Sequence, residues 1–291
     1  MIALAIGLAV FVGIALGLLG GGGSILTVPL LAYVAGMDAK QAIATSLLVV
    51  GVTSAIGAVS HARAGRVQWR TGLIFGAAGM AGAYAGGLLA RFIPGTVLLI
   101  GFAVMMVATA IAMLRGRRTV ETGGGDQRLP MPKIIAEGLV VGLVTGLVGA
   151  GGGFLVVPAL ALLGGLPMPV AVGTSLVVIA MKSFAGLAGY LSSVQIDWTV
   201  AMAVTAAAVL GALIGARLTA MVDPAALRKT FGWFVLAMSS VILAQEIHLS
   251  VGIAAVALTA IAAGMTLACT RFAHCPLRRP TGVATSGRAV A

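Results

Sequence analysis

Four stretches of the chain are about twenty residues long, almost entirely apolar and free of charged side chains. They cover residues 71–90, 95–114, 198–216 and 249–270. An α-helix rises about 1.5 Å per residue, so about 20 apolar residues cross a hydrocarbon core roughly 30 Å thick. Only 9% of all residues are charged, against about 25% in soluble domains. The sequence therefore predicts an all-α protein that spans a membrane several times.

The chain also contains an internal duplication. The segment from Gly17 to Ser24, with four consecutive glycines, returns 129 residues later between Gly146 and Gly153. Composition alone would not make prolines and tryptophans coincide, so the sequence predicts two homologous repeats. The same shift produces these further matches: Val28-Pro29 with Val157-Pro158, Thr45-Ser46-Leu47 with Thr174-Ser175-Leu176, Gly57 with Gly186, Trp69 with Trp198, and Gly82 and Gly86 with Gly211 and Gly215.

The duplication divides the chain into units. Each repeat is expected to contain a helix (2–19 and 133–148), a glycine break, a short helix (24–36 and 153–165) and three long helices. The short pieces reach only about 20 Å, too little to cross the membrane unless they are half-helices or strongly tilted. The predicted units are repeat 1 at 1–114, a linker at 115–132, repeat 2 at 133–245, an additional transmembrane helix at 246–270 and a basic tail at 271–291.

Basic residues predict how the chain sits in the membrane. Lys and Arg collect in short cytoplasmic loops. If the repeats are inverted, fifteen of the 18 basic residues face the cytoplasm; if they are parallel, only eight do. We therefore expect inverted repeats in a cell membrane, with an outside N-terminus and a cytoplasmic C-terminus. The net charge of +11 is explained by this topology, and we expect no nucleic-acid partner.

The glycine breaks are the first candidate site. A helix that begins inside the bilayer presents unpaired N–H groups and partial positive charge, which suit an anion. Glycines would let the ligand approach the backbone, although they could also serve helix packing, the reading we favour for Gly82, Gly86, Gly211 and Gly215. Hydroxyls near the third helix of each repeat could bind the anion or cap a helix. The candidate residues are Gly22, Gly23, Ser24, Thr45, Ser46, Gly151, Gly152, Gly153, Thr174 and Ser175.

Lys182 is the strongest single candidate. It lies deep within an apolar segment, and its counterpart in the first repeat is the uncharged Thr53. An ionisable side chain inside a membrane is a functional hypothesis by default, and snorkelling to the interface is the alternative. Glu137 and Asp197 fall near segment ends, so a bound anion would be its natural partner. His61 is expected to be structural, and Trp69 and Trp198 to be interface anchors.

Signs of other chemistry are missing from the sequence. HExxH, GxSxG and GxxxxGK[ST] patterns are absent, so we expect no enzyme activity and transport without ATP. Gly149–Gly153 imitates a dinucleotide loop, but no βαβ unit surrounds it. Cys269 and Cys275 lack the spacing of a metal or redox site. We predict no cofactor and no metal.

The glycine motif followed by Val28-Pro29, with its echo at 146–158 and Thr174-Ser175-Leu176, resembles the sulfite exporter TauE/SafE family over residues 2–245. The resemblance implies a permease for small sulfur-containing anions such as sulfite, sulfoacetate or other organosulfonates, usually moved outward. A non-transporting assembly or sensor subunit and an anion channel are the alternatives. Glycine-rich helix faces also permit a homodimer.

Overall fold

The computed structural model describes residues 2–19, 22–114, 131–149, 152, 156, 160, 168–218 and 224–246, and these are helical apart from short connections. The predicted additional helix at 246–270, the tail at 271–291 and most of the linker lie outside the described residues. The elements are α1 (Ile2–Leu19), η1 (Gly22–Leu26), α2 (Thr27–Pro29), η2 (Leu30–Val34), α3 (Ala39–Arg63), α4 (Trp69–Leu89), η3 (Ala90–Phe92), α5 (Gly95–Leu114), α6 (Met131–Val148), α8 (Met168–Leu191), α9 (Trp198–Leu218) and α10 (Pro224–Glu246).

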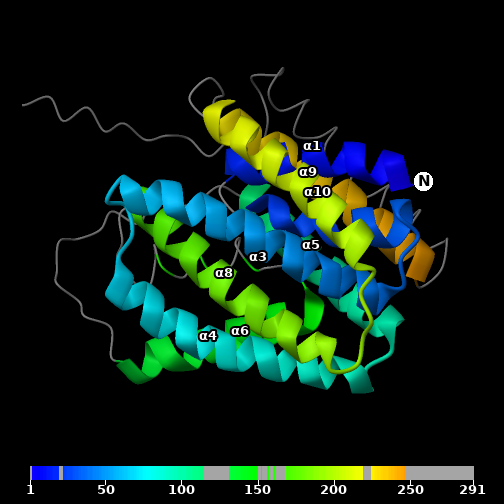
Figure 1. Cartoon of the computed structure of the whole chain (residues 1–291), viewed down its shortest axis with the longest axis horizontal. Coiled ribbons are helices and arrows are strands. Elements are labelled where there is room, and N and C mark those ends of the chain that lie inside the picture. The colour runs from blue at the N-terminus through cyan, green and yellow to red at the C-terminus, as the bar shows by residue number, and fades with distance from the viewer. Residues whose placement is uncertain are drawn as a thin grey trace, which may run out of the picture.

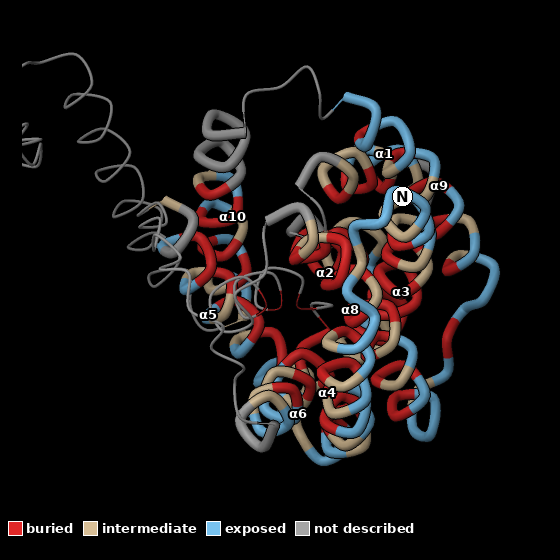
Figure 2. The backbone as a smooth tube through the Cα atoms, turned by 90° about the vertical axis from the view of Figure 1, so that its left-hand side faces the viewer, coloured by how far each residue is buried: buried red, intermediate tan, exposed pale blue. Residues whose placement is uncertain are grey.

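Four helices in this part of the chain are long and apolar enough to cross a membrane: α3, α4 with η3, α8 and α9. The prediction had placed spans at 71–90 and 198–216, which α4 and α9 match. The span predicted at 95–114 coincides with α5, whose described apolar stretch, Gly95–Ile111, is shorter than those four. The share of the span that is buried in the protein is 72% for α3 and 67% for α8, against 44% for α4 and 39% for α9. Figures 1 and 2 place α3 and α8 accordingly between the other helices.

Helix boundaries repeat with the interval found in the sequence. Shifting α1 by 129 residues gives the bounds of α6, and shifting α4 gives those of α9; α3 with α8 and α5 with α10 agree at their first residues. Local chemistry sets some of these boundaries. Asp38 caps α3, because its Oδ2 accepts a hydrogen bond from the Lys40 N–H at 3.1 Å, and Asp197 Oδ1 likewise accepts from Thr199 at the start of α9. Thr45 and Ser46, in the second turn of α3, are therefore not its N-terminal cap.

Packing pairs join helices from the two halves: α1 with α9, α4 with α6, α3 with α8 and α5 with α10. Glycines make two of these contacts close. A Cβ on Gly211 or Gly215 of α9 would collide with backbone carbonyls of Val10 or Ile14 in α1. The same holds for Gly82 and Gly86 of α4 against Leu139 and Leu143 of α6. The packing role expected for these four glycines is confirmed.

The central helices α3 and α8 run in opposite directions. At the start of α3, Gln41 Nε2 donates to the carbonyl of Gln195, just after α8 ends, over 3.2 Å. Beyond the end of α3, the Gln68 N–H donates to Thr174 Oγ1 near the start of α8, over 2.9 Å. Because α3 and α8 occupy equivalent positions in the duplicated sequence, their opposite directions are those that an inverted pair of repeats would have.

The short segment after the first glycine run is an irregular helix. It passes from a 3₁₀ turn (η1) through a single α turn (α2) to a wide π turn (η2), and it ends before Gly36, whose φ is +71°. Residues 24–31 are buried, which allows irregular backbone at this depth because protein, rather than lipid, surrounds it. In the second half, the predicted helix at 153–165 lies outside the described residues except for 156 and 160.

Candidate functional site

Lys182 lies in the interior of the protein. Its side chain is 1% exposed, and among the charged side chains whose burial the structure describes it alone is buried. The Nζ atom donates a hydrogen bond to Thr145 Oγ1 of α6 over 3.1 Å. Thr145 can accept this bond because its own proton goes back to the Val141 carbonyl, 2.7 Å away. The amine therefore points into the core, and the snorkelling alternative does not describe this side chain.

Gly152, in the second glycine run, packs directly against this amine. Gly149 and Gly152 have φ values of +74° and +62°, in the left-handed region that favours glycine. The first ends α6, and its carbonyl accepts a hydrogen bond from Ser46 Oγ of α3 over 3.1 Å. A Cβ on Gly152 would collide with both Lys182 Nζ and Thr145 Cγ2. The bare backbone at Gly152 thus lets the chain turn directly over the lysine.

Of the predicted site residues, the structure brings Gly152 and Lys182 together, and Ser46 meets the same glycine turn. Gly22 and Gly23 open the 3₁₀ turn η1, in which Ser24 is fully buried; Thr45 is buried beside Ser46. Thr174 and Ser175 lie two turns before Lys182. Their hydroxyls already serve structure, since Thr174 accepts from Gln68 and Ser175 donates to the Val172 carbonyl. Gly151 and Gly153 lie outside the described residues.

No carboxylate accompanies the lysine among the residues that the structure describes. Asp38 and Asp197 cap helices at the ends of the bundle, and Glu246 accepts a hydrogen bond from Tyr33 over 3.1 Å. Glu137 is half-exposed on α6. Within the described ranges, no group of three His, Cys, Asp or Glu side chains could hold a metal ion. The site therefore offers hydrogen-bond donors and, when the amine is protonated, a positive charge, which suit an anion.

Sequence reasoning missed three polar residues around this centre. Thr145 accepts the lysine hydrogen bond, and Tyr190 donates its hydroxyl proton to the Leu147 carbonyl at the end of α6. Ser183, next to Lys182, is fully buried, and its Oγ has no hydrogen-bond partner. Thr145 sits one residue before the repeated glycine motif, so its place beside the break was the one available signal.

The helical fold, with four helices apolar and long enough to span a membrane in the described part of the chain, is that of a multi-pass membrane protein with a buried amine at its centre. Residues 5–242 match the family described as sulfite exporter TauE/SafE, so the chain belongs to this family. The resemblance seen in the sequence is thereby confirmed.

Curated relatives are described as probable membrane transporter proteins. A probable membrane transporter protein of Xylella fastidiosa is 37% identical over 242 residues, covering 80% of this chain and 92% of that protein. One from Methanocaldococcus jannaschii is 32% identical, covering 64% of this chain and 72% of its own length. One from Bacillus subtilis is 28% identical, with 75% and 90% covered. No solved structure shows a significant match to the chain. The family and these names indicate a membrane transporter rather than an enzyme.

Proposed function

We propose that the chain is a secondary transporter that exports a small sulfur-containing anion, such as sulfite, sulfoacetate or another organosulfonate. The observation that carries this proposal is the buried Lys182. Its amine donates a hydrogen bond to Thr145, and Gly152, which has no side chain, packs against both residues. The family description, sulfite exporter, supports the class of substrate.

Burying the charged form of Lys182 costs free energy. An ammonium group in a low-dielectric interior is costly unless an opposite charge compensates it. The described part of the chain supplies no carboxylate there, so an oxyanion from solution would be stabilised by the amine. An inside-negative membrane potential would also favour the exit of an anion by about 2.3 kcal/mol per charge per 100 mV. Export then needs neither ATP nor a proton-carrying carboxylate.

We further propose that the two halves are inverted repeats and that the C-terminus is cytoplasmic. The opposite directions of α3 and α8 support inversion, because these helices are equivalent under the 129-residue shift. The distribution of Lys and Arg supports the orientation. Inverted repeats with broken helices are typical of transporters that bind their substrate between the repeats.

The test is flux of radiolabelled sulfite and sulfoacetate in liposomes that contain the purified protein. Wild-type protein should transport at least one of them, and Lys182→Met should lose that flux while Lys40→Met keeps it. Lys40 is a matched control because its Nζ only reaches the Arg91 carbonyl at the end of the bundle. A thermal-shift screen with sulfite, sulfate, taurine, sulfoacetate and simple carboxylates should show stabilisation by the transported anion. Absence of both flux and stabilisation would refute the proposal, and channel-like conductance would replace the carrier with an anion channel.

A further inference from the structure

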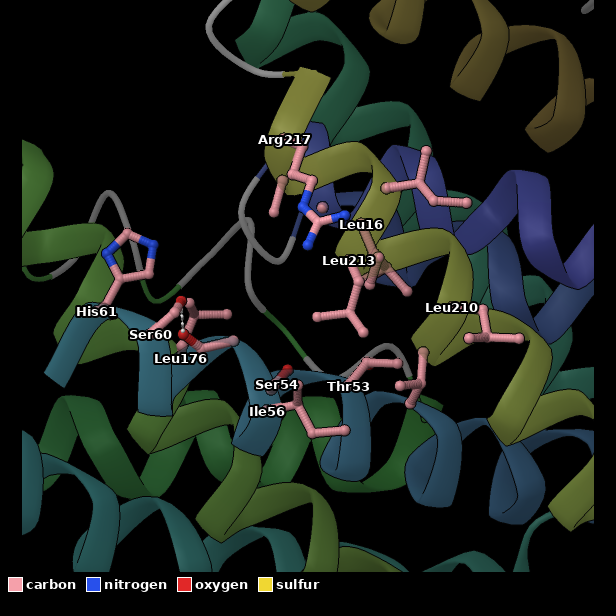
Figure 3. A pocket seen from close by; sticks show the side chains of 16 residues that line it. Leu16, Thr53, Ser54, Ile56, Ser60, His61, Leu176, Leu210, Leu213 and Arg217 are labelled. Atoms are coloured by element: carbon pink, nitrogen blue, oxygen red, sulfur yellow. Dashed lines mark hydrogen bonds between the residues drawn. The ribbon is translucent and has the colours of Figure 1, made fainter. Parts of the chain in front are cut away.

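A cavity of about 600 Å³ lies between α3 and α9 (Figure 3), and Lys182 is not among the residues that line it. One wall is formed by α3, with Thr53, Ser54, Ser60 and His61, and the other by α9. Pockets for small organic molecules usually measure roughly 300–1,000 Å³. The space therefore has the size of a ligand site, much larger than a bare three-oxygen anion requires.

The α3 wall carries one buried hydroxyl that lacks a hydrogen-bond partner. Thr53 and Ser60 donate their protons to the carbonyls of Val49 and Gly57, over 2.7 and 2.8 Å. Ser54 is 2% exposed, and its Oγ has no hydrogen-bond partner. A buried hydroxyl without a partner is unfavourable, because it has lost its hydrogen bonds to water. An acceptor group in the cavity would remove this cost.

Charge and apolar surface divide the cavity. From the last turn of α9, Arg217 extends its guanidinium group into the space between the helices, and His61 stands at the same end on α3 (Figure 3). Among the described residues that line the cavity, none carries a carboxylate. The rest of the α9 wall is apolar, with Leu210 and Leu213. An anionic group and a hydrocarbon group would each find a complementary surface here.

The duplication gives this interface a counterpart in which the helices are in close contact. Under the 129-residue shift, the contact between α3 and α9 corresponds to that between α8 and α4. There a Cβ on Gly189 would lie 3.0 Å from Gly87 Cα and 2.7 Å from the Tyr84 carbonyl oxygen, so the two backbones touch. In the cavity, the counterparts of Gly189 and Gly87 are Ser60 and Ala216, which line open space.

Two further matched positions show the same difference. A Cβ on Gly57 of α3 would meet only the Leu176 side chain within 4 Å, whereas one on its counterpart Gly186 would also meet backbone atoms of Ala83 and Gly146. Tyr190 donates to the Leu147 carbonyl, while its counterpart His61 has no partner for Nδ1. One of two equivalent interfaces is thus sealed in this structure, and the other is open.

The open interface is also lined by the counterpart of the lysine site. Thr53 and Ser54 are equivalent to Lys182 and Ser183, and both serines have a buried Oγ without a hydrogen-bond partner. The cavity therefore leads to the first-half equivalent of the residues on which the transport proposal rests.

We propose that the cavity between α3 and α9 is the site where the transporter takes up a small organic anion. Arg217 and Ser54 bind the anionic group, and Leu210 and Leu213 contact its hydrocarbon part. This inference rests on the proposed function and narrows the substrate to an anion with a short alkyl group, in preference to bare sulfite.

The test uses Ser60→Cys as a reporter, in full-length protein with Cys269→Ser and Cys275→Ser, in phosphatidylcholine nanodiscs that expose both faces. The labelling rate with N-ethylmaleimide is measured against 1-propanesulfonate, sulfite and propylammonium. Propanesulfonate should slow labelling at least tenfold, sulfite should do so only at much higher concentration, and propylammonium should have no effect. Arg217→Gln and Ser54→Ala should each raise the half-protecting concentration about tenfold, and Arg91→Gln, outside the cavity, should leave it unchanged. Ser193→Cys, on the α8–α9 connection, should show no protection.

The inference would be overturned if propanesulfonate gave no protection, or if sulfite protected equally well. It would also be overturned if Arg217→Gln and Ser54→Ala left the half-protecting concentration unchanged. Protection that only phosphatidylglycerol in the disc provides would overturn it too, because the cavity would then be a lipid site. Lys182→Met separates the two proposals. If it leaves flux intact while propanesulfonate still protects Ser60→Cys, the proposed transport site fails and the cavity stands. If flux depends on Lys182 and protection is missing, only the cavity inference fails.

Discussion

At the scale of single residues, the centre of the molecule combines one buried amine with glycines whose backbone conformation other residues avoid. Lys182 is held by Thr145, and Gly152 leaves room for its Nζ. A buried polar group of this kind costs stability unless a ligand or a partner compensates it. The same residues should therefore respond differently to tests of stability and of transport.

Replacing the amine should reveal this difference. Lys182→Met keeps a similar chain length and removes the desolvated charge, so the unfolding midpoint should stay the same or rise. Lys182→Ala should unfold at a lower temperature than Lys182→Met, because shortening a buried side chain to alanine costs about 2–5 kcal/mol. Thermal unfolding in detergent, with flux measured in parallel, checks both. A large loss of stability in Lys182→Met would indicate a structural role instead.

Gly152 should tolerate no side chain. Gly152→Ala would place a Cβ against Lys182 Nζ and Thr145 Cγ2 and keep a φ of +62°, at a cost of about 1–3 kcal/mol for the backbone alone. We expect a lower unfolding midpoint and loss of flux. Gly101→Ala is the control, since a Cβ there would meet nothing within 4 Å, and the change should be neutral or slightly stabilising. Equal midpoints for the two variants would contradict the geometry at Gly152.

At the scale of helices, the contacts between the halves depend on whether glycine or a larger residue occupies each matched position. Glycines at 82, 86, 211 and 215 allow equally close backbone contact in the equivalent pairs α4–α6 and α1–α9. Gly87 and Gly189 bring the backbones of α4 and α8 into contact, whereas the equivalent pair α9 and α3 has Ala216 and Ser60 at these positions and stands further apart. Sequence periodicity identified the first set as packing residues. It said nothing of the second, because closeness depends on how both partner helices are placed.

Gly87→Ala should weaken the sealed interface. Its Cβ would lie 2.5 Å from the Gly186 carbonyl oxygen and 3.0 Å from Gly189 Cα, and overpacking of this kind typically costs about 1–3 kcal/mol. The expected result is a lower unfolding midpoint, measured by thermal unfolding in detergent. Gly101→Ala again serves as the reference. A midpoint as high as that of the reference would mean that α4 and α8 separate without cost.

At the scale of the whole molecule, inverted repeats predict that the two halves cross the membrane in opposite directions. Ala64 and Ser193 are both exposed and are equivalent under the 129-residue shift, at the ends of α3 and α8. Because these helices are antiparallel in the structure, the two positions lie at opposite ends of the bundle. By the positive-inside rule, the basic residues that follow Ala64 predict that its end faces the cytoplasm, as the proposed orientation requires.

Single cysteines at these positions test the orientation. In a background with Cys269→Ser and Cys275→Ser, a membrane-impermeant maleimide added to intact cells should label Ser193→Cys and spare Ala64→Cys. In inverted membrane vesicles the pattern should reverse. Labelling of both from the same side would rule out inverted repeats, and the reversed pattern would place the C-terminus outside.

The sequence by itself determined the class of the protein, its duplication and the glycines that join its halves. Apolar length and residue spacing are local properties of the chain. They identify membrane spans because the bilayer requires long apolar helices. The sequence also singled out Lys182, because a charge in an apolar segment stands out in one dimension. Only the tertiary structure decided that Thr145 receives the lysine, that Thr174 instead holds the α3–α4 connection, and that α3 and α9 stand apart where α4 and α8 touch. These outcomes depend on distances between segments that are far apart in the chain, and no local pattern encodes such distances.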